Sequence, residues 1–374
     1  MFYLKIFSYI LATPYQYQTI LGMNKAQILA TNEEIVNALK DWKSIISKYQ
    51  VPNTKKAIIQ LITSFGPFIG LWVLMYFSLN WSILLTAALG VINAFFLVRI
   101  FIIQHDCGHQ SFTKSKQLNN LIGRVCSLFS FIPYRYWAKT HNFHHGHCGQ
   151  LEVRDIGDIP TITVKEYQER SAWGRLKYRI WRNPIVTFVI APIYYFIVSC
   201  RYPTFNFGNW KKWTKEIVKD NFWITTSYIL VGWLVGWQKF LLIQVTLVVL
   251  FGIIAFWFFY VQHQHEMSYK QWKKNWQFIL SAIKGSTYYK LPKMFHWLTG
   301  NIGYHHIHHL SSLIPNYNLE KCFKENAILS KYVTSISFTE SLKLMYNKLW
   351  HEDQQRMISF TEFRRLERAG LLAA

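Results

Sequence analysis

The chain has 374 residues, of which 51% are hydrophobic, 18% are aromatic and only 16% are charged, and its net charge is +22. The apolar residues gather in runs long enough to cross a bilayer, which excludes an ordinary soluble globular domain and favours membrane embedding. The positive charge does not indicate nucleic-acid binding, because the basic residues flank the apolar runs and form no recognisable nucleic-acid module.

The N-terminal 22 residues differ from the rest of the chain. They are rich in aromatic side chains and lack the charged, apolar and cleavage-site order of a secretory signal. A polar, helix-forming stretch begins at Met23. We interpret residues 1–22 either as an extension or misassigned start, or as an interfacial anchor helix.

Four apolar segments predict transmembrane helices, at residues 57–79, 81–103, 222–236 and 240–261. The first two match the roughly 30 Å of hydrocarbon in a bilayer, whereas the third is short and needs its flanking residues to reach the headgroups. Residues 184–200 contain two prolines and predict a half-inserted or interfacial hairpin. Residues 118–133 predict a helix on the membrane surface.

Basic residues mark one side of these spans. The turn at residues 78–81 carries no Lys or Arg, and the turn of the second hairpin carries only Lys239. The large basic stretches lie outside the hairpins, which places both termini on the cytoplasmic side. The predicted fold is an all-α integral membrane protein with four transmembrane helices in two hairpins, interfacial or half-inserted helices, and a cytoplasmic helical cap.

Twelve of the fourteen histidines fall into four clusters, all on the predicted cytoplasmic side: HDCGH at 105–109, HNFHHGH at 141–147, QHQH at 262–265 and HHIHH at 305–309. His105 and His109 are one helical turn apart and therefore share a face. HNFHH and HHIHH each place histidines at i, i+3 and i+4, which directs two rings to one metal and the third toward a neighbouring metal.

Eight histidines share this spacing: His105, His109, His141, His144, His145, His305, His308 and His309. They are too many for one four-coordinate zinc, so the pattern predicts two metals. Imidazole binds zinc, copper, iron and nickel, so the ligand type leaves the metal open. His147, His265 and His306 fall off the spacing and are weaker candidates. We interpret His296 and His351 as structural or surface residues, and we expect the five scattered cysteines to be free thiols.

The ordered motifs resemble the membrane fatty acid desaturases, particularly their acyl-lipid Δ12-type branch. HDCGH, HNFHH and HHIHH occur in the family's order, WLTGNIGYHHIHHLSSLIPNYNL resembles its third-box region, and FFYVQHQHE resembles a further family segment. The similarity covers about residues 40–351. We therefore expect a desaturase domain over residues 23–351 and a cytoplasmic tail over residues 352–374.

The resemblance implies a non-haem di-iron centre with O2 as co-substrate, held by the eight box histidines and a ninth histidine near the end of the last span. His263 matches the ninth position best, whereas His265 stands where many relatives have Phe, so this choice stays open. The implied substrate is a membrane lipid acyl chain. The implied electron donor is a separate protein, a ferredoxin or a cytochrome b5-like carrier, and the implied location is a bacterial inner membrane or an ER-type membrane.

Residues around the site have candidate supporting roles. Five acids near the boxes are candidates to orient ligand rings: Asp106, Glu152, Asp155, Asp158 and Glu266. Aromatic residues of the spans are candidates to line a narrow acyl tunnel: Trp72, Tyr76, Phe256, Trp257, Phe258 and Phe259.

Two alternatives remain. A related hydroxylase, acetylenic-bond-forming enzyme or carotenoid oxygenase would use the same motif spacing. A histidine-rich metal transporter is disfavoured, because the predicted spans contain no Asp, Glu or His and only Arg99. The resemblance favours a Δ12/ω6 double bond in a glycerolipid, but the sequence leaves Δ9 or ω3 positions and a CoA or acyl carrier protein thioester open.

Overall fold

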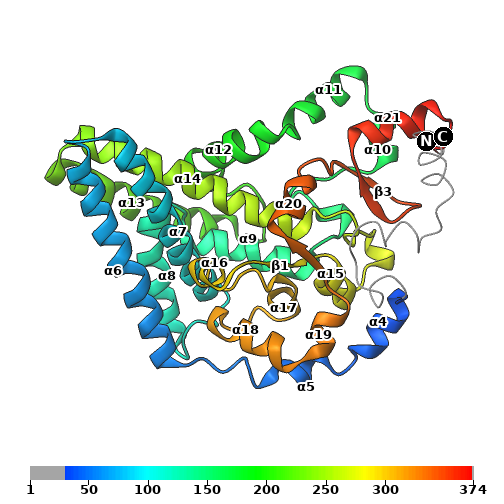
Figure 1. Ribbon diagram of the computed structural model, residues 1–374, viewed down its shortest axis with the longest axis horizontal. Coiled ribbons are helices and arrows are strands. Elements are labelled where there is room, and N and C mark those ends of the chain that lie inside the picture. The colour runs from blue at the N-terminus through cyan, green and yellow to red at the C-terminus, as the bar shows by residue number, and fades with distance from the viewer. Residues whose placement is uncertain (1–29, 373–374) are drawn as a thin grey trace.

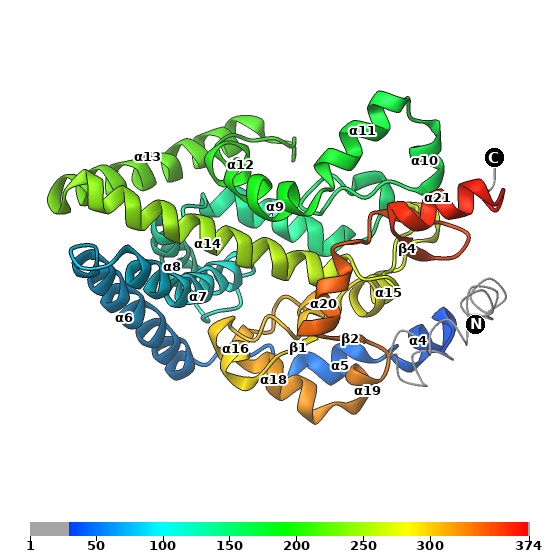
Figure 2. The same cartoon turned by 45° about the horizontal axis from the view of Figure 1, so that its top comes forward.

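The computed structural model describes residues 30–372, so the expectations for residues 1–22 lie outside the described part. Within it, four long helices form two hairpins: α6 (Thr54–Ser78) with α7 (Ile83–Gly108), and α13 (Trp210–Val235) with α14 (Trp237–His263). Figures 1 and 2 show these hairpins beside a cap of short helices. The predicted all-α membrane architecture is confirmed.

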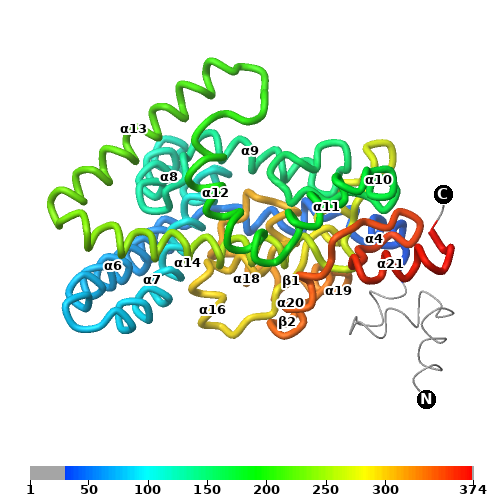
Figure 3. Tube along the Cα trace, turned by 90° about the horizontal axis from the view of Figure 1, so that it is seen from above, coloured from blue at the N-terminus to red at the C-terminus, as the bar shows by residue number. Residues whose placement is uncertain are grey.

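The turns of both hairpins lie at one end of the molecule's long axis and the cap lies at the other, as the view from above shows (Figure 3). The two turns touch, since Lys239 Nζ donates to Asn80 Oδ1 at 2.7 Å. Each hairpin therefore sends its helix ends toward the same cap, where a shared site can be built.

Local signals set the ends of the first hairpin. The side chain of Asn53 accepts from the backbone N–H of Lys56 and begins α6, and that of Ser82 accepts from Leu85 and begins α7. Helix α7 runs five residues beyond the predicted span and ends at Gly108. The first histidine cluster thus lies on the continuation of this helix.

Within residues 30–372, three helices are long and apolar enough to cross a membrane: α6, α7 and α14. Helix α13 begins at Trp210, twelve residues before the predicted span, because the basic segment before residue 222 joins the same helix. A bent pair, Ala172–Trp181 with Val186–Arg201 at 57°, gives a fourth candidate if it counts as one span. A full crossing by residues 222–236 and a half-inserted hairpin at 184–200 stay predictions.

The remaining elements connect the hairpins or build the cap. The helices are α4 (Asn32–Ala38), α5 (Trp42–Ser47), α8 (Lys116–Ser130), α9 (Tyr134–His147), α10 (Val164–Glu169), α11 (Ala172–Trp181), α12 (Ala191–Ile197), α15 (Phe278–Lys284), α16 (Lys293–Leu298), α17 (His305–Leu310), α18 (Asn316–Glu325), α19 (Ala327–Lys331), α20 (Phe338–Leu344) and α21 (Phe360–Arg368), with a π-helical turn at Val186–Ile190 and 3₁₀ turns at Leu151–Val153, Ser199–Arg201 and Lys273–Asn275. β1 (Thr287–Lys290) pairs in parallel with β2 (Thr334–Ser337), and β3 (Leu349–His351) pairs antiparallel with β4 (Arg356–Ile358).

Two apolar cores hold these parts together. One lies between α6, α7 and α14 and includes Leu97, Leu247 and Phe251. The other lies in the cap, where Leu39 and Leu319 meet residues of α15 and α17. The histidine-bearing helix ends lie between these two cores, which fixes their position from both sides.

Helix α8 was predicted to lie on the membrane surface, and its faces fit that place. Leu121 and Val125 are exposed, whereas Gly123 and Cys126 face inward. Arg124 ties the helix to α13 through Asp220 at 2.5 Å.

Gly123 gives a test of this packing. A Cβ at residue 123 would lie 2.4 Å from the ring of the fully buried Tyr134. We expect Gly123→Ala to destabilise the protein by about 1–3 kcal/mol, because this ring has no room to move. The midpoint of heat-induced loss of the monodisperse protein in detergent measures the effect.

The matched control is Gly70→Ala on α6, where nothing lies within 4 Å of the added Cβ. We expect this variant to keep or slightly raise the midpoint, because Ala favours a helix over Gly. Equal midpoints for the two variants would contradict the close packing of α8 on Tyr134.

Candidate metal centre

Four helix ends carry the clustered histidines to one buried place. His105 lies in the last turn of α7, and His109 caps that helix. The second cluster occupies the last two turns of α9, His263 is the last residue of α14, and the third cluster forms α17. The structure thus brings together residues separated by up to about two hundred positions.

The ligand atoms fall into two groups within the described residues. The first group contains His105, His109, His141, His145 and His308, whose candidate ligand atoms all lie within 4.8 Å of one another. His145 Nε2 lies 3.1 Å from His141 Nε2 and 3.0 Å from His308 Nε2. This group joins α7, α9 and α17.

The second group contains His144, His263 and His309, together with Cys148. His305 joins it, because His305 Nε2 lies 2.9 Å from His263 Nε2 and 3.1 Å from His309 Nε2. His263 Nε2 is also 3.3 Å from His144 Nε2. Each i, i+4 pair therefore enters one group while the histidine at i+3 enters the other.

These distances fit metal ions. Metal–imidazole bonds of about 2.1 Å at 90–109° to one another place two ligand nitrogens about 3.0–3.4 Å apart. Neutral imidazoles whose lone pairs converge at this distance repel one another unless a cation lies between them. The donor set therefore fits a bound metal in each group.

Neighbouring groups fix which nitrogen faces inward. His105 Nδ1 donates to Asp106 Oδ1 at 3.0 Å, and His109 Nδ1 donates to Asn142 Oδ1 at 2.7 Å. His263 Nδ1 donates to the carbonyl of Gly285 at 3.2 Å. A proton held on Nδ1 leaves Nε2 free to bind metal.

Asp106 connects the site to the cap. Its Oδ2 accepts from the backbone N–H and the side-chain amide of Asn316, at 2.6 and 2.8 Å. The carboxylate thus positions His105 and the start of α18 together. Of the other acids predicted to orient ligands, Glu152 binds the N–H of Lys273 and Glu266 pairs with Arg356, so neither contacts a ligand ring.

Burial keeps the clustered rings neutral. It lowers the pKa of His144 to about 3, and burial together with neighbouring histidines lowers the pKa of His145 and His308 well below the usual value. A neutral ring is the form that binds metal.

The buried thiol of Cys148 lies 3.5 Å from His263 Nδ1, on the side of that ring away from the other histidines. Burial raises the pKa of the Cys148 thiol.

The other histidines lie outside both groups. His147 stacks on Phe143 at 4.0 Å, and His296 stacks on Tyr304 at 4.7 Å. His265, His306 and His351 belong to neither group. The sequence left open whether His263 or His265 is the ninth ligand. His263 belongs to the second group and His265 does not, which favours His263.

An apolar cavity of about 400 Å³ opens beside the histidines. Its lining includes His105, His141 and His305, and also Phe256, Phe258 and Phe259, which the sequence offered as tunnel candidates. Trp72, Tyr76 and Trp257 do not line it. They bond instead to Gln244, to the Val235 carbonyl and to Tyr289 respectively.

Sequence reasoning missed two supporting residues. Asn142 is held by the carbonyls of Gly108 and Ala138, so its oxygen is fixed toward His109. The ring of Trp137 stacks on His141 at 4.8 Å. Both residues lie within about one helical turn of His141 on α9. This closeness in the sequence was the signal that could have identified them as supporting residues.

Comparisons with known proteins agree with this geometry. A family described as "Fatty acid desaturase" matches residues 79–339. A "Fatty acid desaturase" of Bacillus subtilis (strain 168) is 42% identical over 335 residues, which cover 88% of this chain and 93% of the relative.

More distant relatives have more specific names. An "sn-1 oleoyl-lipid 12-desaturase" of Picosynechococcus is 24% identical over 334 residues, which cover 84% of this chain and 90% of the relative. An "sn-1 acyl-lipid omega-3 desaturase (ferredoxin)" of Nostoc is 28% identical over 264 residues, which cover 67% and 69%.

The second histidine cluster contains its own matched pair for a metal-binding test. We expect the purified wild-type chain to hold two metal ions, and His145→Ala to lose metal, because His145 lies between His141 and His308 in the first group. His147→Ala, two residues away and outside both groups, is expected to keep the wild-type content. Elemental mass spectrometry of protein purified in detergent measures the content, and equal loss in both variants would contradict the grouping.

The role of Asp106 is tested by Asp106→Asn, which keeps the shape of the side chain and removes its charge. We expect metal affinity to fall about 10–100-fold, because the carboxylate strengthens His105 as a ligand. Competition with a chelator measures this affinity. An unchanged affinity in a normally folded variant would show that Asp106 only joins α7 to α18.

Proposed function

The chain belongs to the membrane fatty acid desaturase family, and we propose that it introduces a cis double bond into a lipid-linked acyl chain at a centre of two non-haem irons. Membership makes it an oxidoreductase acting on acyl chains. The observation that carries the proposal is that two groups of buried histidines lie beside an apolar cavity, which His105, His141 and His305 help to line.

The reaction needs a strong oxidant. A methylene C–H bond has no acidity that a side-chain base can use, so its removal requires oxygen chemistry at a metal. Two irons held by histidine would supply this oxidising power from O2. In the balanced reaction, O2, two electrons and two protons remove two hydrogens from neighbouring carbons and form two molecules of water.

The protein's own residues position the acyl chain. Phe256, Phe258 and Phe259 form an apolar wall that holds an extended chain and excludes water. His105, His141 and His305 border the same cavity, so methylene groups beside these three rings would lie against the metal centre. The ligands are proposed to be the eight box histidines and His263.

The position of the double bond is proposed to be Δ12, also called ω6. Relatives named as 12-desaturases and as an "Omega-6 fatty acid desaturase, chloroplastic" of Glycine max support it. The depth of the cavity beyond the metal centre would set this position, because the chain end or the carrier must stop at a fixed place.

Electrons are proposed to come from a separate ferredoxin or cytochrome b5-like protein. Relatives whose names include "ferredoxin" support a donor of this kind. The net charge of +22 favours an acidic partner and raises its rate of association.

We propose that the chain lies in a bacterial inner membrane or an ER-type membrane, with its termini and metal centre on the cytoplasmic side, because the basic segments lie on that side of the spans.

Product analysis tests the proposal. In a host that lacks desaturases, we expect the wild-type chain and His147→Ala to form a new cis double bond in membrane-lipid acyl chains, and His145→Ala to form none. Fatty-acid methyl esters, separated by lipid class and analysed with double-bond localisation, give the readout. Hydroxylated or keto products would favour a hydroxylase or carotenoid oxygenase, and product formation by His145→Ala would refute catalysis at the first group.

A further inference from the structure

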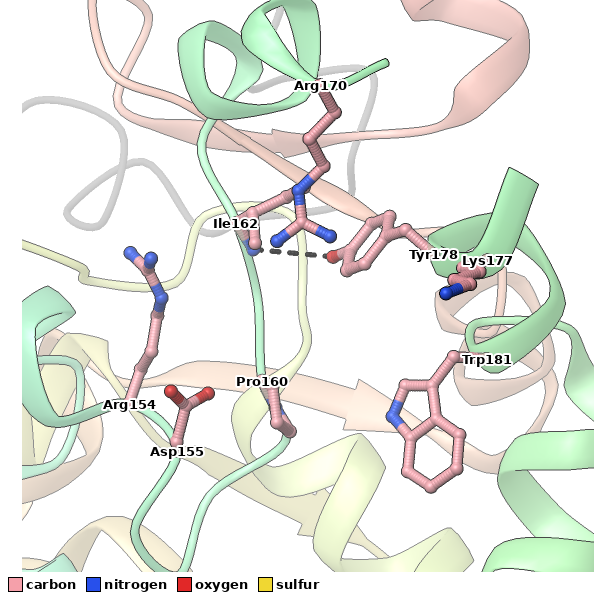
Figure 4. A pocket seen from close by; sticks show the side chains of 8 residues that line it. All are labelled: Arg154, Asp155, Pro160, Ile162, Arg170, Lys177, Tyr178 and Trp181. Atoms are coloured by element: carbon pink, nitrogen blue, oxygen red, sulfur yellow. Dashed lines mark hydrogen bonds between the residues drawn. The ribbon is translucent and has the colours of Figure 1, made fainter. Parts of the chain in front are cut away.

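A second cavity, of about 330 Å³, adjoins the acyl cavity (Figure 4). The two cavities share Asp155, Pro160 and Trp181 in their linings. The smaller cavity lies between the segment after α9 and helix α11. The two cavities are therefore neighbours that share part of one wall.

The lining of the smaller cavity is basic. Arg154, Arg170 and Lys177 contribute three positive groups, and Asp155 contributes one negative group. Figure 4 shows Arg154 and Asp155 on one side, and Lys177 on the opposite side beyond Tyr178. Arg154 Nη2 binds Glu166 at 2.5 Å, whereas its Nη1 is buried without a hydrogen-bond partner among the described residues.

Two further cations lie behind this lining. Arg182 borders the acyl cavity, is 1% exposed, and donates to Gln264 Oε1 at 2.9 Å and to the carbonyl of Asn347 at 3.0 Å. Lys348 is 4% exposed, and its ammonium has no hydrogen-bond partner in residues 30–372. Burial, with the charge of Arg182, lowers the pKa of Lys348 to about 7. Within the described part of the chain, no carboxylate forms an ion pair with Arg182 or Lys348. Asp155 lines both cavities and Asp158 lines the apolar one, so the smaller cavity keeps three basic groups against one acid.

The residues around the cavity are of the kinds found at the level of lipid headgroups. Helix α11 exposes Trp173, Ile180 and Trp181, and it continues into the bent apolar segment that ends at Arg201. Lys177 lies on the same helix as these apolar side chains. Exposed Trp and basic residues on one helix are typical of the boundary between hydrocarbon and headgroups.

We propose that the smaller cavity binds the phosphate ester of the acyl carrier while the acyl chain occupies the apolar cavity. This inference rests on the proposed function and names the substrate class as a phosphate-bearing carrier. Arg170 and Lys177 are exposed and Arg154 is half-buried in the lining of this cavity, whereas Arg182 lines the neighbouring apolar cavity. Guanidinium and ammonium groups bind phosphate oxygens through charge-assisted hydrogen bonds, which an uncharged sugar headgroup cannot match.

The test uses Arg170→Gln/Lys177→Gln. Both side chains are exposed, so the double variant is expected to fold normally. The control is Lys165→Gln, which removes an exposed lysine of α10 that does not line the cavity. The full-length proteins are assayed in nanodiscs with the same acyl chains on phosphatidylglycerol or on uncharged galactolipid, and with the matching acyl-CoA.

We expect the double variant to raise the KM for a phosphate-bearing carrier about tenfold or more, with little change for galactolipid. The carrier whose KM rises, phosphatidylglycerol or acyl-CoA, identifies the source of the phosphate. Lys165→Gln should match the wild type on every carrier. Equal KM changes on galactolipid and on the phosphate carriers, or no change on any of them, would overturn the proposal.

A second readout does not depend on turnover. Native mass spectrometry should find phosphatidylglycerol or acyl-CoA retained by the wild type and by Lys165→Gln but lost from the double variant. If the wild type retained the ligand and formed no desaturated product, the phosphate site would stand and the proposed function would fall. If the wild type desaturated all carriers and the double variant retained the phosphate ligand equally well, the phosphate site alone would fall.

Discussion

The convergence of nine imidazoles in one buried space is the constraint on which the rest of the structure depends. The ring nitrogens lie 2.9–3.3 Å apart, a spacing that fits ligands of a common metal ion. Four helix ends must also arrive together with defined ring orientations. Asp106, Asn142 and the carbonyl of Gly285 fix three of those rings from outside. Residues of both apolar cores pack beside these helix ends, so the histidine cluster and the fold depend on the same contacts.

The arrangement of cavities follows from this centre. The apolar cavity is lined by histidines and by Trp181 of helix α11, and the basic cavity adjoins it at Asp155, Pro160 and Trp181. A lipid that occupied both cavities would keep its polar part among charges and its chain among aromatic rings. Specificity for carrier and for double-bond position would then come from two neighbouring cavities.

Much of this could be predicted from the sequence, because two signals were strong. Long apolar runs predicted α6, α7 and α14, and histidines at i, i+3 and i+4 predicted that two rings would face one metal and the third a neighbouring one. The structure puts His141 and His145 in one group and His144 in the other. Family resemblance supplied His263, which spacing alone did not select. The supporting contact between Asp106 and Asn316 joins residues far apart in the chain, so no local pattern contains its partner.

The errors have physical causes. A helix that is apolar on all sides gives no sign of which face lines a cavity, so Trp72 and Tyr76 were only candidates to line the acyl tunnel. They form hydrogen bonds with α14 and with the end of α13 instead. The start of α13 was placed too late because hydropathy detects the apolar part of a helix and not its basic extension.

The most direct test of the central claim is anomalous X-ray scattering at the iron edge from the iron-loaded protein. We predict two peaks, one within bonding distance of His141, His145 and His308, and one within bonding distance of His144, His263 and His309. A single peak, or peaks away from these rings, would contradict the account.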